Sequence, residues 1–555
     1  MAEISLPIPF QQAVLGSQSY PENTIQRTLE THPKFLYNSK CRLDERECDL
    51  FEDNAVEWEV PIRDLSTAYG KDVDKYNIHS HEKLVEWLGV KVELSSQGLP
   101  IVTGVKKDPK CRFIYIYGMH SRSKLRLTKA MLVDILTFHQ VMPAFLDFLH
   151  IFGQQSEPTD LNFSGFREQV TLTNPSDGLI IPGLGRSGKH YQMCFNLKGV
   201  ALKSKIKENF MLNEWSIRPA VFHHQFDITS GNTLWIVIKG NLEIQQRFKA
   251  LTDKDGRAQD KSFNTTEESF RSSLSAQLMF GYWAMEDWRW YIKWLERVVD
   301  NKIAKPAKHI MAVLGPCGAG YSHKTYTPRD IQDLQIWEER IRQVIIALEG
   351  NADVLSALVA FYNRLIGNES FPLRKTCSLD ISDFANKIGN IIADFRMQTK
   401  RAEFLVDTIA DRRQLVIQHL QSQSASRSEQ LSRSMEQEQV FMLIITVVTL
   451  IYLPATFVST FFSTDVIKYQ DSDSPEGTFS NTALSRWLQV TIPLTAVTCG
   501  VAWLARRWAL TKRGQNEIGL ESRSTPWKLR KYTLSSSITL LPFHNKTPAE
   551  TKCSF

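Results

Sequence analysis

Four acidic residues lie close together in a short segment between two long apolar runs of this chain. They are Asp465, Asp471, Asp473 and Glu476, and with one lysine they give the segment from Ser463 to Ser485 a net charge of −3. Carboxylate oxygens suit hard divalent cations such as Mg²⁺, and clustered negative charge concentrates cations. Taken alone, the segment is better explained as a solvated loop, so a role in cation binding needs support from the flanking runs.

The two flanking runs are long enough to cross a bilayer as helices. Val440 to Phe462 contains no charged residue and would span about 34 Å, against a hydrocarbon core of about 30 Å. Trp487 to Ala505 is also uncharged. A helix of a soluble core would carry a polar stripe at a period of 3.6 residues, and the first run has only threonines and one tyrosine. We therefore predict transmembrane helices at 440–464 and 486–505, joined by an acidic external loop at 465–485.

The distribution of basic residues predicts the orientation of these helices. The tail from 506 to 555 has a net charge of +7, and Arg506, Arg507, Lys512 and Arg513 directly follow the second run. By the positive-inside rule this tail is cytoplasmic, and two crossings place the N-terminal part in the cytoplasm as well. The N-terminus also lacks an Arg-rich, acid-poor import signal, which favours the plasma membrane over the mitochondrial inner membrane. Lipid is thus an expected partner.

The part before the membrane has the pattern of a mixed α/β domain followed by helices. Residues 1–100 are mixed and irregular, and 101–370 is predicted to be a cytoplasmic α/β domain. Its clearest strand is Cys111 to Gly118, and Thr229 to Asn232 is typical of a hairpin turn. Thr128 to Phe152 is predicted to form one helix, kinked at a proline.

A stalk helix at 371–439 is predicted to run directly into the first transmembrane helix. Five of its residues recur at intervals of three and four, namely Val406, Ile409, Arg413, Val416 and Leu420. This spacing fits either a coiled-coil seam or a helix packed on its own domain.

Several motifs suggest an activity that their context excludes. Gly183 to Lys189 matches a phosphate-binding loop, but His190 replaces the required Ser or Thr and a strand follows instead of a helix. His223 and His224 are adjacent on a predicted strand and therefore point to opposite faces, so they cannot share a metal. No catalytic constellation or cofactor motif stands out, so we expect no enzyme and no resident cofactor. The basic excess is confined to the tail, so we expect no nucleic-acid partner.

The first apolar run resembles the pore helix of the CorA family of magnesium channels. Thr449 to Phe462 contains the Leu-Pro-Ala-Thr core at 453–456, and Phe462 takes the aromatic place before the family's Gly-Met-Asn filter. Arg506-Arg507-Trp508 looks like the family's basic terminus, and residues 113–132, 138–148 and 215–227 look like CorA-like proteins of filamentous fungi. The resemblance implies an α/β cytoplasmic domain, a stalk helix, two C-terminal transmembrane helices and a homopentamer.

The same resemblance aligns one face of the first transmembrane helix with a pore. The aligned residues are Met442, Ile445, Thr449, Leu453, Thr456 and Thr460. Apolar members would form constrictions that gate by dewetting, and the threonine hydroxyls would replace lost water contacts. The alternative is that this face packs against the second transmembrane helix, because hydroxyl residues also mediate helix contacts in lipid.

The chain departs from the family at the filter. Ser463-Thr464-Asp465 stands in place of Gly-Met-Asn, and in a pentamer Asp465 would place five carboxylates, as metal ligands, at the pore mouth. We therefore expect a divalent-cation channel or transporter, with Mg²⁺ as its ion. The rival hypothesis is a non-conducting, membrane-anchored interaction module, which the altered filter favours.

Overall fold

The computed structural model describes residues 3–28, 31–65, 73–94, 100–155, 161–202, 215–253, 255–300, 326–463 and 481–521. These form two compact units, Met1–Ser422 and Gln423–Phe555. Unit 1 is an α/β domain with long helices, and unit 2 contains the apolar helices near the C-terminus. The predicted fold class is confirmed.

Unit 1 is built on a seven-stranded sheet. The strands lie in the order β3-β2-β6-β10-β9-β8-β7, and every neighbouring pair is antiparallel except β6 and β10, which are parallel. The strands are β2 (Val60–Leu65), β3 (Val73–Ile78), β6 (Cys111–Tyr117), β7 (Phe166–Thr171), β8 (His190–Leu202), β9 (Trp215–Asp227) and β10 (Thr233–Lys239). The predicted hairpin turn joins β9 to β10. A small sheet contains β1 (Ile4–Ser5), β5 (Pro100–Gly104) and β4 (Val90–Leu94).

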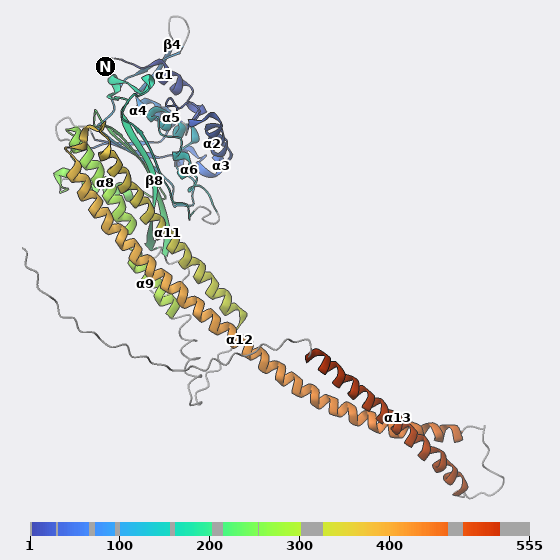
Figure 1. The fold of residues 1–555 in the computed structure, drawn as a ribbon. Helices are drawn as coiled ribbons and strands as arrows, with labels where there is room; N and C mark the ends of the chain where they lie inside the picture. Colours follow the sequence, from blue (N-terminus) through green and yellow to red (C-terminus); the bar gives the residue numbers. More distant parts are fainter. Residues whose placement is uncertain are drawn as a thin grey trace, which may run out of the picture. The chain divides into compact units, whose positions relative to one another are not determined.

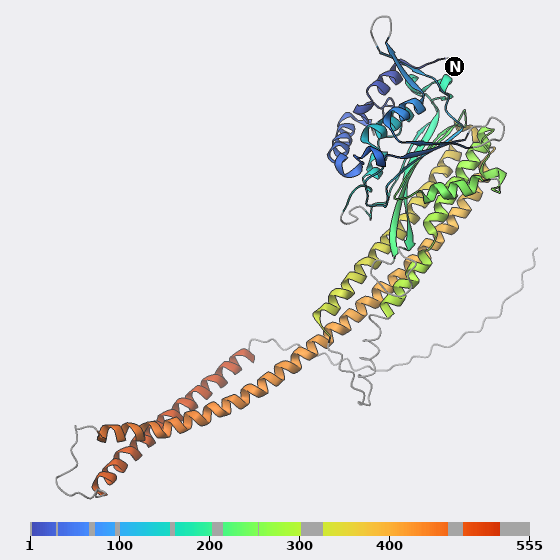
Figure 2. The ribbon, with the colours of Figure 1, turned by 180° about the vertical axis from the view of Figure 1, so that it is seen from behind.

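Helices cover both faces of the large sheet (Figures 1 and 2). On one face lie α1 (Ile8–Leu15), α2 (Pro33–Glu45), α3 (Glu47–Leu50), α4 (His81–Leu88), α5 (Lys129–His139) and α6 (Phe145–Leu149). On the other lie α7 (Glu243–Thr252), α8 (Thr266–Met285), α9 (Trp288–Val298), α11 (Pro328–Gly367) and the start of α12 (Ser378–Ser463). Because both faces are covered, β6 is buried along its whole length, with Phe113 and Ile114 in different core clusters.

The segment predicted as one kinked helix at 128–152 is two helices. The break between α5 and α6 begins at Gln140, which adopts a left-handed conformation with φ of 51°. Its side-chain oxygen accepts from the backbone N–H of Ile25 at 3.0 Å, and its own carbonyl accepts from Gln192 at 3.0 Å. Contacts from distant parts of the chain therefore fix the break.

The predicted stalk helix is confirmed as the long, continuous α12. The predicted start of its stalk segment at 371 falls within an irregular connection, and the helix itself begins at Ser378. Among the five residues that recur at intervals of three and four, Val406, Ile409 and Val416 are buried in the unit 1 core. Arg413 forms an ion pair with Glu338 of α11 at 2.6 Å. The row is thus used for packing within the chain.

Unit 2 contains the end of α12 and α13 (Asn481–Glu521). The two helices pack through Pro454 and Val458 on α12, which are buried, and through Thr491 on α13. Trp487 of α13 donates a hydrogen bond from its indole nitrogen to the hydroxyl of Ser459 at 3.0 Å.

Candidate functional site

Three helices in the described part of the chain are long and apolar enough to cross a membrane. Two of them, Phe441–Thr460 and Leu484–Leu504, coincide with the predicted transmembrane helices. Only 11% and 6% of the most apolar 18-residue stretch of each helix are buried. The third, Pro328–Gly367, is α11, and half of its most apolar stretch is buried. The apolar residues of α11 belong to the core of unit 1, as Leu348 and Leu355 illustrate.

The six predicted pore-lining residues lie on the part of α12 that belongs to unit 2. All six are exposed within the chain, and Met442, Ile445 and Leu453 have 67%, 61% and 65% of their surface exposed. None of the six is buried against α13, whose contact with α12 uses Pro454 and Val458 instead. The row is therefore open to a partner outside the chain.

Part of this row borders a groove between the two helices. Leu453, Thr456 and Thr460 line the groove on the α12 side, and Leu494 and Thr498 line it on the α13 side. One edge of each of these three residues therefore faces the second helix, as the alternative predicted. The rest of their surface is exposed.

The threonine hydroxyls of the row are oriented by their own helix. Thr449 donates to the carbonyl of Ile445 at 2.8 Å, Thr456 donates to the carbonyl of Tyr452, and Thr460 donates to that of Thr456. Each hydroxyl thereby gives its hydrogen to the backbone and keeps its oxygen lone pairs free. Water bound to a cation presents its hydrogens outward, so such oxygens are suitable acceptors for a hydrated cation.

The backbone of α12 has one interruption beside this row. Pro454 has no N–H, so the carbonyl of Leu450 lacks its usual helical donor. A proline within a transmembrane helix is tolerated where neighbouring helices or hydroxyl side chains satisfy the freed group. Here the proline is buried, and it lines the groove that Leu494 and Thr498 of α13 border on the other side.

The predicted filter lies at the end of α12. Ser463 is the last residue of the helix and donates from its hydroxyl to the carbonyl of Thr460 at 2.9 Å. The remaining filter and loop residues lie outside the described residues, namely Thr464, Asp465, Asp471, Asp473 and Glu476. Within the described residues, no group of three or more His, Cys, Asp or Glu side chains could hold a metal ion.

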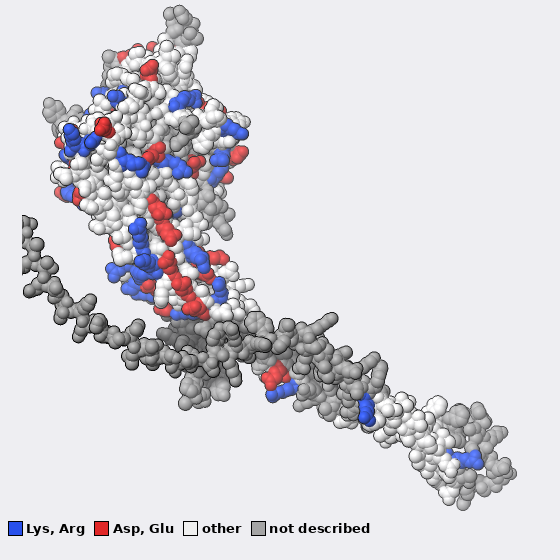
Figure 3. Space-filling model, in the orientation of Figure 1, with Lys and Arg blue, Asp and Glu red and all other residues white. Residues whose placement is uncertain are grey.

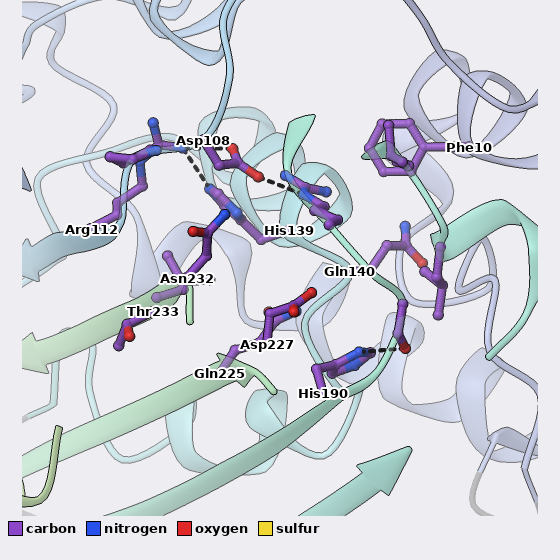
Figure 4. Close-up of a pocket in the computed structure, with 16 residues that line it drawn as sticks. Phe10, Asp108, Arg112, His139, Gln140, His190, Gln225, Asp227, Asn232 and Thr233 are labelled. Atoms are coloured by element: carbon purple, nitrogen blue, oxygen red, sulfur yellow. Dashed lines mark hydrogen bonds and ion pairs between the residues drawn. The ribbon is translucent and has the colours of Figure 1, made fainter. Parts of the chain in front are cut away.

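A second candidate site is a small cavity in unit 1 that the sequence did not suggest (Figure 4). It has a volume of about 60 Å³, and its walls include Asp108, Arg112, His139, Arg186 and Asp227. These side chains come from the start of β6, the end of α5, the turn before β8 and the end of β9. They are far apart in the chain, so no local motif marks them.

The charged groups of the cavity neutralise one another. Arg112 pairs with Asp64 at 2.9 Å and with Asp108 at 3.5 Å, and Arg186 pairs with Asp108 at 2.6 Å. Burial, with the positive charge of Arg112, holds the pKa of His139 well below its usual value, so this imidazole is neutral.

The carboxylate of Asp227 caps the hairpin turn between β9 and β10. It accepts hydrogen bonds from Ser187 and from the backbone N–H groups of Thr229 and Ser230. The charged groups of the cavity are thus paired, and its carboxylates already accept hydrogen bonds from the protein. The cavity is therefore a structural polar network with space for a few waters.

The two adjacent histidines of β9 point to opposite faces of the sheet, as predicted. His224 stacks on Trp235 with ring centroids 3.9 Å apart, while His223 contacts Phe145 on the other side. Burial lowers the pKa of His223 to about 3 and that of His224 well below its usual value. Both are therefore neutral parts of the core.

Similarity to known proteins identifies the family of this chain. The model of the family CorA-like transporters matches residues 12–307, which is more than half of the chain. No curated protein matches. Solved structures similar to this chain include the ZntB cytoplasmic domain from Vibrio parahaemolyticus, with 10% identity, a TM-score of 0.31 and coverage of 64% of this chain and 98% of that one. The CorA magnesium transporter from Methanocaldococcus jannaschii has 10% identity, a TM-score of 0.30 and coverage of 80% and 96%. On the family match, this chain belongs to the CorA-like transporters.

Proposed function

We propose that this chain is one subunit of an oligomeric membrane channel or transporter that passes divalent metal cations, with Mg²⁺ as its principal ion. The observation that carries the proposal is the row from Met442 to Thr460, whose six residues are exposed within a chain of this family, with only Leu453, Thr456 and Thr460 bordering the groove to α13. A row of apolar and hydroxyl residues on one face of a membrane helix suits a narrow aqueous path.

The row would act on a hydrated ion in two ways. Met442, Ile445 and Leu453 form apolar rings that exclude water when narrow and admit it when wide, which gates the path by dewetting. Thr449 and Thr456 accept hydrogen bonds from the hydration shell through the lone pairs that their backbone bonds leave free. Mg²⁺ gives up its waters reluctantly, so it favours a path that contacts the hydration shell.

The segment after α12 would attract the ion to the mouth of the path. Asp465 follows the helix almost directly, and Asp471, Asp473 and Glu476 add negative charge nearby. Several copies of Asp465 around one axis would repel one another unless a cation lies among them. A carboxylate ring is therefore a ligand set for a partly hydrated divalent ion, with Ser463 and Thr464 supplying neutral oxygens.

A pore of this kind requires several copies of the chain, and we propose a homopentamer. One copy supplies one row, and a single row cannot enclose a path. A second exposed face supports assembly, because Ala393, Met397 and Phe404 lie at intervals of four and seven on the outer side of α12, with Met397 and Phe404 exposed by 55% and 70%. Apolar faces of this kind are typical of helix–helix contacts.

The proposed topology has two membrane crossings, both termini in the cytoplasm and residues 465–485 outside. We place the protein in the plasma membrane, with lipid around the outer faces of α12 and α13. Domain boundaries at 100, 370, 439, 464, 485 and 505 belong to the same proposal, as does the particular similarity to fungal members of the family.

A second candidate function is a non-conducting, membrane-anchored interaction module. The observation that favours it is the replacement of Gly-Met-Asn by Ser463-Thr464-Asp465. Serine restricts the backbone where glycine is free, so a filter that needs glycine geometry would be lost.

Growth rescue separates the two functions. The full chain is expressed in cells that lack their own magnesium uptake and depend on high external Mg²⁺. We expect growth at low Mg²⁺ with the wild-type chain and none with a chain that ends at residue 438. Equal failure of both chains, with the wild type present in the membrane, would support the anchor function instead.

A further inference from the structure

Helices α9, α11 and α12 of unit 1 share one core, and each leaves a different face exposed. Trp294 of α9 contacts Trp337 of α11 with ring centroids 5.8 Å apart. Arg401 of α12 pairs with Glu296 of α9 at 2.8 Å, which joins the third helix to the first. Acidic and basic side chains form separate strips along this helical part of the unit (Figure 3).

The outer side of α9 is basic and aromatic. It consists of Arg289, Trp290, Lys293 and Arg297, which are all exposed and which we name the α9 face. Trp290 has 51% of its surface exposed, and the cations of Arg289 and Lys293 lie 5.5 Å and 5.1 Å from its ring. None of the three cations has an ion pair within the described residues. An exposed tryptophan among unpaired cations is typical of a binding surface.

The outer side of α11 has the opposite character. Asp333, Ile336, Glu339 and Ile346 are exposed on one side of this helix, and we name them the α11 face. The two isoleucines have 48% and 40% of their surface exposed. Neither Asp333 nor Glu339 has an ion pair within the part of the chain that the structure describes. Arg342, which lies nearby, is already paired with Glu338 at 2.8 Å.

The two faces lie at the same level along the bundle. Near one end, Gly199 of β8 lies against Trp283 of α8, and Lys198 beside it is bonded to Asn351 of α11. Further along, Trp294 meets Trp337. The residue numbers rise along α8 and α9 while they fall along α11, so the two chain directions are opposed.

This antiparallel arrangement sets which charges could meet. Counting from the contact between Trp294 and Trp337, Arg297 lies within about one residue of the level of Asp333. By the same count, Lys293 lies within about one residue of the level of Glu339. Two of the three cations of the α9 face, Lys293 and Arg297, thus have an acidic counterpart at their own height on the α11 face.

The two faces point away from the shared core on different helices, so they cannot pair within one chain. We propose that the α9 face of one subunit docks on the α11 face of the next subunit, with Lys293 beside Glu339, Arg297 beside Asp333 and Trp290 packed between the isoleucines. The proposal rests on the oligomer of the proposed function. Such an interface joins two different surfaces, and repetition of it around an axis closes a ring.

The charges and the apolar residues have different roles in this interface. Exposed ion pairs are individually weak, so their main role here is specificity. They determine which face is bound and at which level along the helices the two faces align. Trp290 supplies most of the buried apolar surface and serves as the anchor.

Cross-linking between two distinguishable chains tests the contact. Full-length chains with different tags, one with Lys293→Cys and the other with Glu339→Cys, are co-expressed in a Cys48→Ser background and treated in membranes with a short thiol cross-linker. We expect a covalent dimer that carries both tags. Neither variant alone should cross-link, since the interface brings residue 293 to residue 339 and not to another copy of itself. A chain with Lys34→Cys on α2 in place of Lys293→Cys is the matched control and should give no dimer.

Charge reversal provides a second, independent measurement. Lys293→Glu with Arg297→Glu should raise the monomer fraction of the detergent-solubilised protein at least tenfold, and adding Asp333→Lys with Glu339→Lys to the same chain should restore the oligomer. If the wild type is oligomeric but shows no cross-link and no response to charge reversal, this interface is wrong while the proposed function stands. A monomeric wild type would overturn both. Cross-linking of the Lys293→Cys chain to itself would show a symmetric contact and would also contradict the proposal.

Discussion

Asn351 of α11 hydrogen-bonds to both backbone groups of Lys198 in the middle of β8. Its side-chain oxygen accepts from the Lys198 N–H at 2.8 Å, and its amide nitrogen donates to the Lys198 carbonyl at 2.7 Å. The neighbouring strand β7 pairs with β8 only as far as Phe195. Beyond that residue the asparagine takes the place of a strand partner, and so it fastens a long helix to the sheet.

Asn351→Ala should destabilise unit 1. Asn351 is fully buried, and its removal leaves a buried N–H and a buried carbonyl without partners, at a cost of about 2–4 kcal/mol. Urea unfolding of the purified protein, followed by tryptophan fluorescence, measures the change. Asn363→Ala, at an exposed position of the same helix, is the control and should change stability by less than about 0.5 kcal/mol.

Lys198 itself should make stability depend on alkaline pH. Burial lowers the pKa of Lys198 from 10.5 to about 8, and its ammonium donates to the hydroxyl of Ser164 at 2.6 Å. Between pH 8 and 10.5 the unfolded chain binds the proton more readily than the native state, so stability rises with pH across this window. The rise from this group is at most about 3 kcal/mol.

Lys198→Met isolates that contribution. At pH 7 the methionine variant avoids the cost of burying a charge, and its advantage over wild type should shrink as the pH rises from 8 to 10.5. Unfolding curves at several pH values measure the difference, with Lys400→Met on the exposed side of α12 as the control. A difference between wild type and Lys198→Met that stays constant over this range would show that Lys198 titrates normally.

Local sequence patterns predicted those elements whose stability is local. The β-branched and aromatic run at β6, the turn between β9 and β10 and the continuous α12 all follow from periodicity and turn chemistry. The break after α5 does not, because Gln140 is held in its left-handed conformation by Ile25 and Gln192. Nothing in the residues around 140 reveals these partners.

The break between α8 and α9 is also absent from the local sequence pattern. The sequence from 267 to 300 has continuous helical character, yet Asp287 adopts a φ of 68°. Trp288 then turns inward and is almost fully buried, and its indole donates to the carbonyl of Ala284 at 2.7 Å. The cavity around Arg112 was equally hidden, because its pairing with Asp64 joins residues on two different strands. For the candidate pore, the sequence predicted the apolar helix, while the pore-lining role of its exposed row stays a prediction.

The proposed topology predicts which parts of the chain reach the outside. A cysteine introduced at Ser474 should react with a membrane-impermeant thiol reagent in intact cells, while one at Ser424 should react only after permeabilisation. The parent chain, which retains exposed Cys48 in unit 1, on the side that the proposed topology places in the cytoplasm, is the control for leakage. Labelling at Ser424 but not at Ser474 would reverse the orientation.

The hydroxyl of Thr456 should contribute to ion flux. Thr456→Val keeps the shape of the side chain but removes an acceptor for the hydration shell, so flux should fall about tenfold, which corresponds to the loss of about one hydrogen bond. Thr495→Val on α13 removes a hydroxyl with the same backbone bond and should have little effect, because Thr495 is outside the proposed path. Flux into liposomes gives both values. An equal loss in the two variants would indicate a role in helix packing.

Magnesium influx through the purified protein tests the central claim most directly. Wild type, Asp465→Asn and Asp465→Lys are reconstituted in liposomes that contain a Mg²⁺-sensitive dye, and the initial rate of influx is measured against an imposed gradient. We predict influx with wild type, influx with altered ion selectivity for Asp465→Asn, and none for Asp465→Lys, since a ring of positive charge bars a divalent ion. No influx with wild type, or equal influx with wild type and Asp465→Lys, would contradict the proposed path.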